Sequence, residues 1–287
     1  MCLDSLYTFF RNWIRLFIMA RVIVITSGKG GVGKTTTTAN LGMSLVQLGY
    51  QTALVDADIG LRNLDLLLGL ENRVIYTALE VLSGECRIEQ ALIKDKRQPG
   101  LVLLPAAQNR NKDSINAEQM KYLISLLEPQ YDYILIDCPA GIETGFHNAI
   151  GPANEAIVVT TPEIAAVRDA DRVIGLLEAN GIKQITLLVN RLRPQMVKAN
   201  DMMSVADVKE ILAIPLIGVI PEDECVIVST NRGEPLVLEK KISLPGLAFE
   251  HTACRLDGQQ VEFLDLQSYS KGPLKRLRKF FLGSSNT

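Results

Sequence analysis

Residues that form disulfides or bind zinc are scarce in this chain of 287 residues. It has two histidines and five cysteines (Cys2, Cys86, Cys138, Cys225 and Cys254), and no two cysteines form a CxxC pair. Disulfide scaffolds and structural zinc sites depend on such residues at close, regular spacing. We therefore expect neither, and the composition fits a reducing compartment.

Long apolar runs and excess positive charge are also missing. No stretch of about 20 uninterrupted apolar residues occurs, so no helix is expected to span a bilayer. The formal net charge is −2, which argues against a globally basic nucleic-acid-binding protein. With 47% hydrophobic and 22% charged residues, the chain can bury a full core and does not have a disordered composition.

The first 18 residues form an N-terminal extension that leaves two alternatives open. Its apolar stretch, residues 3–18, is interrupted by Asp4, Arg11 and Arg15, unlike the unbroken apolar block of a signal peptide. Apolar residues recur in it at helical spacing, which favours an amphipathic helix. Alternatively, the extension is dispensable and Met19 is the functional start.

From Val22 onward, short apolar runs alternate with helical patterns, which predicts an α/β fold: a doubly wound, mainly parallel sheet with helices on both faces. Strands are predicted at 22–26, 52–58, 101–106, 133–139, 156–162, 185–190 and 216–222, and helices at 35–48, 117–127 and 165–179. We expect one doubly wound domain over 19–256, a linker that could include a short strand over 257–270, and a tail over 271–287.

The segment GKGGVGKT, residues 28–35, matches the phosphate-loop pattern G-x-x-x-x-G-K-[ST] between a strand and a helix. Its glycines let successive N–H groups point at phosphate oxygens. Lys34 is expected to neutralise the β- and γ-phosphates of ATP, and the Thr35 hydroxyl to bind Mg²⁺. A glycine-rich turn that only packs is the alternative, but strand, loop and helix agree on phosphate binding. The predicted binding residues are Gly28, Lys29, Gly30, Gly31, Val32, Gly33, Lys34, Thr35 and Thr36.

Carboxylates end two other predicted strands. Asp137 follows an apolar run and should lie at the carboxyl edge of the sheet, where it could hold Mg²⁺ through water. Asp56 and Asp58 end the second strand, two residues apart and so on the same side of it. A carboxylate there could orient an attacking water, although acidic residues at strand ends are also common on surfaces.

The loop contains a second lysine, and KGGVGKT resembles the deviant Walker A motif of the ParA/MinD ATPase family. Further segments that resemble division-site members of that family are residues 56–74 (DADIGLRNLDLLLGLENRV), 136–143 (IDCPAGIE), 160–163 (TTPE), 167–172 (VRDADR), 218–223 (GVIPED) and 231–235 (NRGEP). The resemblance covers about 20–250 and resumes in the last fifteen residues. In amino-acid detail, the matched segments are similar to those of chloroplast and cyanobacterial members.

The resemblance implies roles for the matched positions. Lys29 would reach across an ATP-bound homodimer to the partner's phosphates, as an arginine finger does. Asp58 would position the attacking water, and Asp137 would support Mg²⁺. The adenine base would be read by Asn190 and flanked by Pro221, Glu222 and Asp223.

Two acidic residues, Asp169 and Asp171, match a face that binds partner proteins in this family. The alternative is that they only open a helix, because carboxylates near a helix N-terminus are favoured by its dipole.

The tail segment KGPLKRLRKFFLG, residues 271–283, combines five cations with bulky apolar residues. Such a segment suits the surface of an anionic membrane, and two tails in a dimer would bind by avidity. The alternatives are a solvated basic tail or a helix on its own domain. The predicted membrane-contacting residues are Leu274, Leu277, Phe280, Phe281 and Leu282.

The sequence thus predicts an ATPase that dimerises with ATP, associates with membrane and helps to place a division site by recruiting regulators of the MinC/MinE type. Its predicted location is peripheral, on the inner envelope of the chloroplast stroma or on the inner face of a bacterial cell membrane facing the cytoplasm. No sequence-specific nucleic acid is expected. A ParA-like DNA-partitioning ATPase and a nucleotide-gated adaptor with little hydrolysis are the alternatives.

Overall fold

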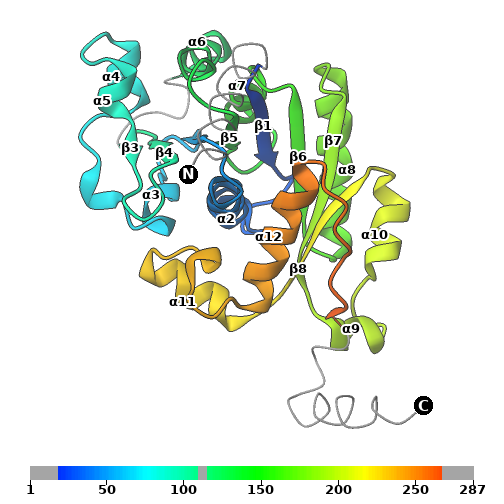
Figure 1. Cartoon of the computed structure of the whole chain (residues 1–287). Coiled ribbons are helices and arrows are strands. Elements are labelled where there is room, and N and C mark those ends of the chain that lie inside the picture. Colours follow the sequence, from blue (N-terminus) through cyan, green and yellow to red (C-terminus); the bar gives the residue numbers. More distant parts are fainter. Residues whose placement is uncertain (1–18, 109–114, 267–287) are drawn as a thin grey trace.

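The computed structural model describes residues 19–108 and 115–266, and an eight-stranded sheet lies at its centre (Figure 1). The strand order is β3-β4-β2-β5-β1-β6-β7-β8, and every neighbouring pair is parallel except the edge pair β3 and β4. The strands are β1 (Arg21–Thr26), β2 (Thr52–Asp56), β3 (Ile93–Lys94), β4 (Leu101–Leu104), β5 (Tyr133–Asp137), β6 (Glu155–Thr160), β7 (Gln184–Leu192) and β8 (Leu216–Pro221).

Helices cover both faces of this sheet, which confirms the predicted doubly wound fold. One face packs against α2, α3, η2 and α12, and the other against α4, α5, α6, α7, α8 and α10. The helices are α2 (Lys34–Gln47), α3 (Leu64–Leu67), η1 (Glu71–Arg73), α4 (Ala78–Leu82), α5 (Ile88–Ala91), α6 (Ala117–Leu127), α7 (Thr144–Ile150), α8 (Ile164–Ala179), α9 (Pro194–Lys198), α10 (Val205–Leu212), α11 (Glu224–Arg232), η2 (Leu236–Leu238) and α12 (Leu244–Leu256).

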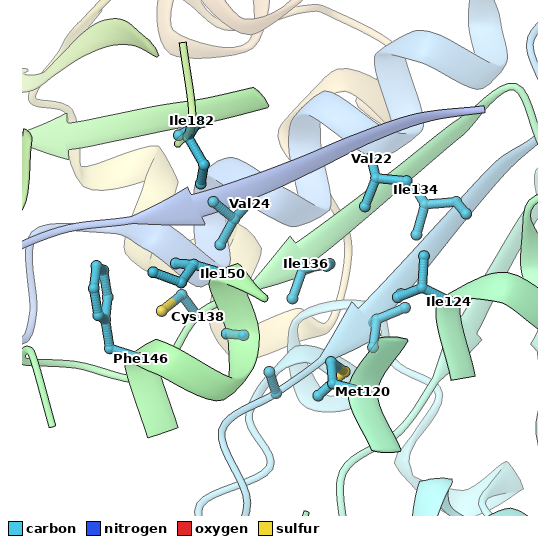
Figure 2. Close-up of a cluster of buried hydrophobic side chains, with 14 of the residues drawn as sticks. Val22, Val24, Met120, Ile124, Ile134, Ile136, Cys138, Phe146, Ile150 and Ile182 are labelled. Carbon is cyan, nitrogen blue, oxygen red and sulfur yellow. The ribbon is translucent and has the colours of Figure 1, made fainter. Parts of the chain in front are cut away.

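Alternation along the central strands divides the core between these two faces. Val22 and Val24 of β1 point to one cluster, with Ile134 and Ile136 of β5 beside them (Figure 2). Ile23 and Ile25 of β1 belong to the cluster on the opposite face. Because successive side chains of a strand point to opposite faces, a strand covered on both sides reads as a continuous apolar run. This explains why these strands could be recognised from sequence.

All seven predicted strands are present, but one further strand was missed and several strand ends differ. The edge strand β3 was not predicted, because its two residues, Ile93 and Lys94, are too few to show a period. Four strands end two residues earlier than predicted: β2, β4, β5 and β6. Because β2 ends at Asp56, Asp58 lies in the loop that follows.

The chain after α12 is held against the domain over residues 257–266 and forms no strand there. Arg255 donates hydrogen bonds to the carbonyls of Val261 (2.7 Å) and Glu262 (2.8 Å), and its guanidinium lies 3.9 Å from the ring centroid of Phe263. Leu266 is buried. Residues 1–18 and the tail over 271–287 lie outside the described residues, and within those residues no helix is long and apolar enough to cross a membrane.

Candidate functional site

The phosphate loop connects β1 to α2, and its tight turn into the helix depends on Gly33. Gly33 adopts φ 102° and precedes the first residue of α2. A Cβ on Gly33 would lie 2.2 Å from Nδ2 of Asn190, so both the backbone angle and the close neighbour require glycine here. The side-chain amide of Asn190 donates to the carbonyl of Val32 (2.7 Å). The end of β7 therefore holds the loop in shape.

The two lysines of the loop point to different environments. Lys34 is buried, and its Nζ donates to Oγ of Ser27 (3.0 Å), whose hydroxyl donates to the carbonyl of Lys29 (2.8 Å). The side chain of Lys29 is exposed and makes no hydrogen bond or ion pair with any described residue. Lys34 is thus held inside its own loop, whereas Lys29 remains available to a second molecule. Ser27 was not predicted, since it precedes the motif.

Asp137 ends β5 beside the loop, as predicted. Its Oδ1 accepts from the hydroxyl of Thr38 (3.2 Å), one turn into α2. Burial raises the pKa of Asp137 to about 6, against the effects of a hydrogen bond from Thr35 and the charge of Lys34. A bound cation would favour the ionised carboxylate in the same way that Lys34 does.

Asp56 lies directly opposite Asp137 in the register of β2 and β5. Burial, and then the nearby charge of Asp137, raises the pKa of Asp56 well above its usual range. Its two oxygens accept from the backbone N–H groups of Asp58 (3.0 Å) and Leu64 (3.3 Å). Asp56 thereby closes the loop that carries the half-buried Asp58, a function that the sequence did not predict. Strand alternation does not apply to Asp58, because the strand ends at Asp56, but the charge of Asp58 still acts on both Asp56 and Asp137.

These residues fit Mg²⁺ with a nucleotide. Among the described residues, no group of three or more acidic, histidine or cysteine side chains could hold a metal alone. Mg²⁺ commonly keeps several waters and takes one or two carboxylates together with phosphate oxygens. The hydroxyl of Thr35 and the buried carboxylate of Asp137 would be the protein groups nearest to it.

A cleft of about 450 Å³ adjoins the loop on the side of β7 and β8. Asn190, Pro221, Glu222 and Asp223 line it, as expected for the base-binding side. The predicted residues Gly33 and Thr36 also line it, and the structure adds residues that the sequence did not single out: Arg191, Arg193, Glu224, Val226 and Ile227. Arg193 forms an ion pair with Glu222, which lowers the pKa of Glu222. The cleft therefore joins the phosphate loop to a partly apolar wall on α11.

The acidic residues of α8 lie away from its N-terminus. The first turn of α8 contains no acidic residue, so the alternative that Asp169 and Asp171 only favour the helix dipole was wrong. Asp171 is exposed, whereas the backbone of Asp169 packs against Gly28 of the phosphate loop. The predicted partner face and the nucleotide loop are therefore in direct contact.

The strand–loop–helix cradle, the buried lysine and the carboxylates at the carboxyl edge of a parallel sheet define a phosphate-loop nucleotide-binding protein. A family model described as the CobQ/CobB/MinD/ParA nucleotide binding domain matches residues 23–236.

Among individual proteins, the chain is 90% identical over 267 residues to a putative septum site-determining protein MinD of Guillardia theta, covering 93% of this chain and 99% of that one. It is 64% identical over 265 residues to the septum site-determining protein MinD of Synechocystis sp., covering 92% and 100%. The chain belongs to the MinD family of septum site-determining ATPases, as the sequence predicted.

Solved structures agree. A MinC:MinD cell division protein complex of Aquifex aeolicus matches with a TM-score of 0.79 and 49% identity, covering 85% of this chain and 98% of that chain. A septum site-determining protein MinD of Pyrococcus horikoshii, complexed with Mg-ADP, matches with a TM-score of 0.76 and 32% identity, covering 89% and 100%.

Proposed function

We propose that this ATPase helps to place a division site through a cycle in which ATP joins two copies, the joined copies attach to a membrane, and hydrolysis releases them. ATP with Mg²⁺ is the substrate of the family to which the chain belongs. The observation that carries the dimerisation step is the separation of the two lysines. Lys34 is buried against Ser27, whereas Lys29 is exposed on the same loop.

The separation matters because a lysine that serves only the bound nucleotide of its own chain would be expected to turn inward. An exposed cation beside the phosphates can stabilise charge on the nucleotide of a facing copy. In this proposal ATP becomes part of the interface between the copies. The loop Asp56–Leu64 would then present Asp58 to an attacking water, with Asp137 supporting Mg²⁺.

Membrane attachment is assigned to the tail, which lies outside the described residues. Its five cations would each contribute on the order of 1 kcal/mol near an anionic surface, and its apolar residues would add a similar amount. One tail alone therefore binds weakly, whereas two in a dimer bind by avidity. Dimerisation would thus switch attachment on. The apolar residues assigned to insertion are Leu274, Leu277, Phe280, Phe281 and Leu282.

Partner recruitment is assigned to α8. Asp171 is exposed there, and Asp169 contacts the phosphate loop, so a regulator on this face could sense the nucleotide. The relative in the Aquifex aeolicus complex is bound to MinC, and we propose a regulator of that type for this chain. With relatives in Guillardia theta and Synechocystis, the proposed location is the chloroplast inner envelope or the inner face of a bacterial cell membrane.

Sedimentation with anionic liposomes tests the coupling. The full-length protein should sediment with ATP and stay largely in the supernatant with ADP, and a version ending at Ser270 should stay in the supernatant with both. Equal sedimentation with ATP and ADP would contradict the coupling. Sedimentation of the shortened version would contradict the assignment to the tail, and ATP-dependent retention on DNA would favour the partitioning alternative.

A further inference from the structure

One arginine outside the nucleotide cleft contacts the C-terminal ends of two helices, α3 and α11. Arg97 lies in the turn between β3 and β4. Its Nη2 donates to the carbonyl of Leu68 (2.6 Å), at the end of α3, and its Nη1 donates to the carbonyl of Gly233 (3.1 Å), at the end of α11. Carbonyls at helix C-termini have no partner inside the helix. The guanidinium therefore satisfies one such carbonyl on each helix at once.

Asp95 fixes the orientation of this guanidinium. Its carboxylate is 1% exposed and accepts from Nε (3.1 Å) and Nη2 (2.6 Å) of Arg97, in a two-point contact. The backbone N–H groups of Arg97 (2.7 Å) and Gln98 (3.2 Å) donate to the same carboxylate. Burial acts to raise the pKa of Asp95, but the hydrogen bonds from Arg97 hold it below its usual range. Asp95 thus holds the guanidinium of Arg97 within the β3–β4 turn, in the orientation that contacts both helices.

The two helix ends make a close backbone contact. Gly69 follows α3 with φ 62°, and Gly233 caps α11 with φ 63°. A Cβ on Gly233 would lie 2.7 Å from Cα of Gly69, and a Cβ on Gly69 would lie 2.9 Å from the carbonyl oxygen of Gly233. No side chain fits between these glycines. Arg97 bridges the contact from the β3–β4 side.

The opposite end of α11 lines the nucleotide cleft, and the opposite end of α3 adjoins the loop that carries Asp58. α3 begins at Leu64, whose N–H is held by Asp56 together with that of Asp58. α11 begins after Asp223, which lines the base-binding cleft with residues of the helix itself. The helix that follows the Asp58 loop and the helix that forms the base-binding wall are therefore joined at their far ends by Arg97 and by the Gly69–Gly233 contact.

We propose that Arg97 is a positioning residue for this ATPase, and that its guanidinium fixes α11 relative to α3 and so sets the spacing between the base-binding wall and the loop that carries Asp58. Lysine cannot replace it, because an ammonium is a point charge that does not reproduce the planar fork. The phosphate loop lies between β1 and α2 and has no hydrogen bond from Arg97. Loss of the fork should therefore weaken recognition of the base and leave the hold on phosphate.

The test compares Arg97→Lys with the matched control Arg73→Lys in the full-length protein with Mg²⁺. Arg73 lies on the neighbouring η1, and its side chain donates to the carbonyl of Lys94 (2.5 Å) but to neither helix. Affinities for ADP and for inorganic pyrophosphate, and single-turnover hydrolysis of ATP, are measured well below the unfolding midpoints. Because a shift of about 1 Å can cost up to 10²-fold in rate, we expect Arg97→Lys to lose about tenfold or more in ADP affinity and in turnover.

In Arg97→Lys, pyrophosphate affinity should stay within about twofold of the parent. In Arg73→Lys, ADP affinity, pyrophosphate affinity and ATP turnover should all stay within about twofold of the parent. The pyrophosphate arm separates positioning from general loosening of the fold, which would weaken both ligands together. Parallel losses of ADP and pyrophosphate affinity would overturn the proposal. A lower unfolding midpoint with ADP affinity and turnover unchanged would also overturn it, since Arg97 would then be a structural contact only. The binding comparison involves neither the tail nor the proposed dimer, so it stands apart from failure of the membrane cycle.

Discussion

Gly28 of the phosphate loop and Asp169 of α8 are in backbone contact: a Cβ on Gly28 would lie 2.3 Å from the carbonyl oxygen of Asp169. The contact joins the loop that would hold phosphate to the helix assigned to partner proteins. No side chain can be inserted there without moving one of the two elements. A movement of α8 should therefore shift the phosphate loop, and a movement of the loop should shift α8.

Gly28→Ala should test this contact. The added methyl group must displace backbone, so we expect a loss of about 1–3 kcal/mol in the free energy of unfolding together with weaker ADP binding. Gly30→Ala is the matched control, because a Cβ there would lie 3.5 Å from Cβ of Ala140, an ordinary contact. Urea unfolding and ADP titration of both variants measure the difference. Equal effects in the two variants would show that the contact with α8 is not the cause.

Lys29→Ala should abolish ATP-dependent dimerisation and hydrolysis, with monomeric ADP affinity within about threefold of the parent. The reason is that the exposed side chain of Lys29 makes no hydrogen bond or ion pair with any described residue, whereas a facing nucleotide would lose a charge-assisted interaction. Light scattering after size-exclusion chromatography with ATP measures the association. The exposed Lys183 provides a control through Lys183→Ala. A Lys29→Ala protein that still dimerises with ATP would end the proposal that this lysine serves the partner.

Asp58→Ala should slow ATP hydrolysis by about 10²–10⁴-fold, the range of a positioned acid or base, while ATP binding is retained. The reason is that Asp56 holds the backbone of this loop, so removal of the Asp58 carboxylate leaves the loop closed. In the liposome experiment, the variant should remain bound to membrane long after the parent has been released. Unchanged turnover in a single-turnover assay would remove Asp58 from its assigned role.

Tyr133 should make the free energy of unfolding fall as the pH rises above about 10. Burial, and then the charge of Asp257, raises the pKa of Tyr133 to about 12, although Arg21 opposes this. A pKa raised in the folded state means that the contribution is fully present below the unfolded value of about 10 and is lost as the pH rises through 12. The two values differ by about 2 units, which corresponds to about 2–3 kcal/mol.

Urea unfolding between pH 8 and pH 11.5 checks this prediction, and Tyr133→Phe should flatten the decline above about pH 10. Tyr122→Phe serves as the control, because Tyr122 is exposed on α6. An equally steep decline in Tyr133→Phe and in the parent would assign this decline to other groups.

Sequence alone was sufficient for the features that are local along the chain. The phosphate loop is contiguous, and the buried strands are recognisable because parallel strands covered on both faces read as apolar runs. The family resemblance rested on such contiguous segments. The two-residue strand β3 was missed and the ends of β2, β4, β5 and β6 were placed two residues too late, since neither a very short strand nor a strand end depends on a repeating pattern.

What only the tertiary structure decided is which distant residues meet. The register of β2 and β5 places Asp56 opposite Asp137, and the buried Lys34 donates a hydrogen bond to Ser27. Arg97 donates to carbonyls that lie 29 and 136 residues away in the sequence. These contacts arise from strand order and helix packing, which bring together segments with no shared local pattern. The sequence by itself determined that the chain has a loop for phosphate. The folded structure decided which residues hold that loop, which residues line the cleft, and that the side chain of Lys29 is exposed.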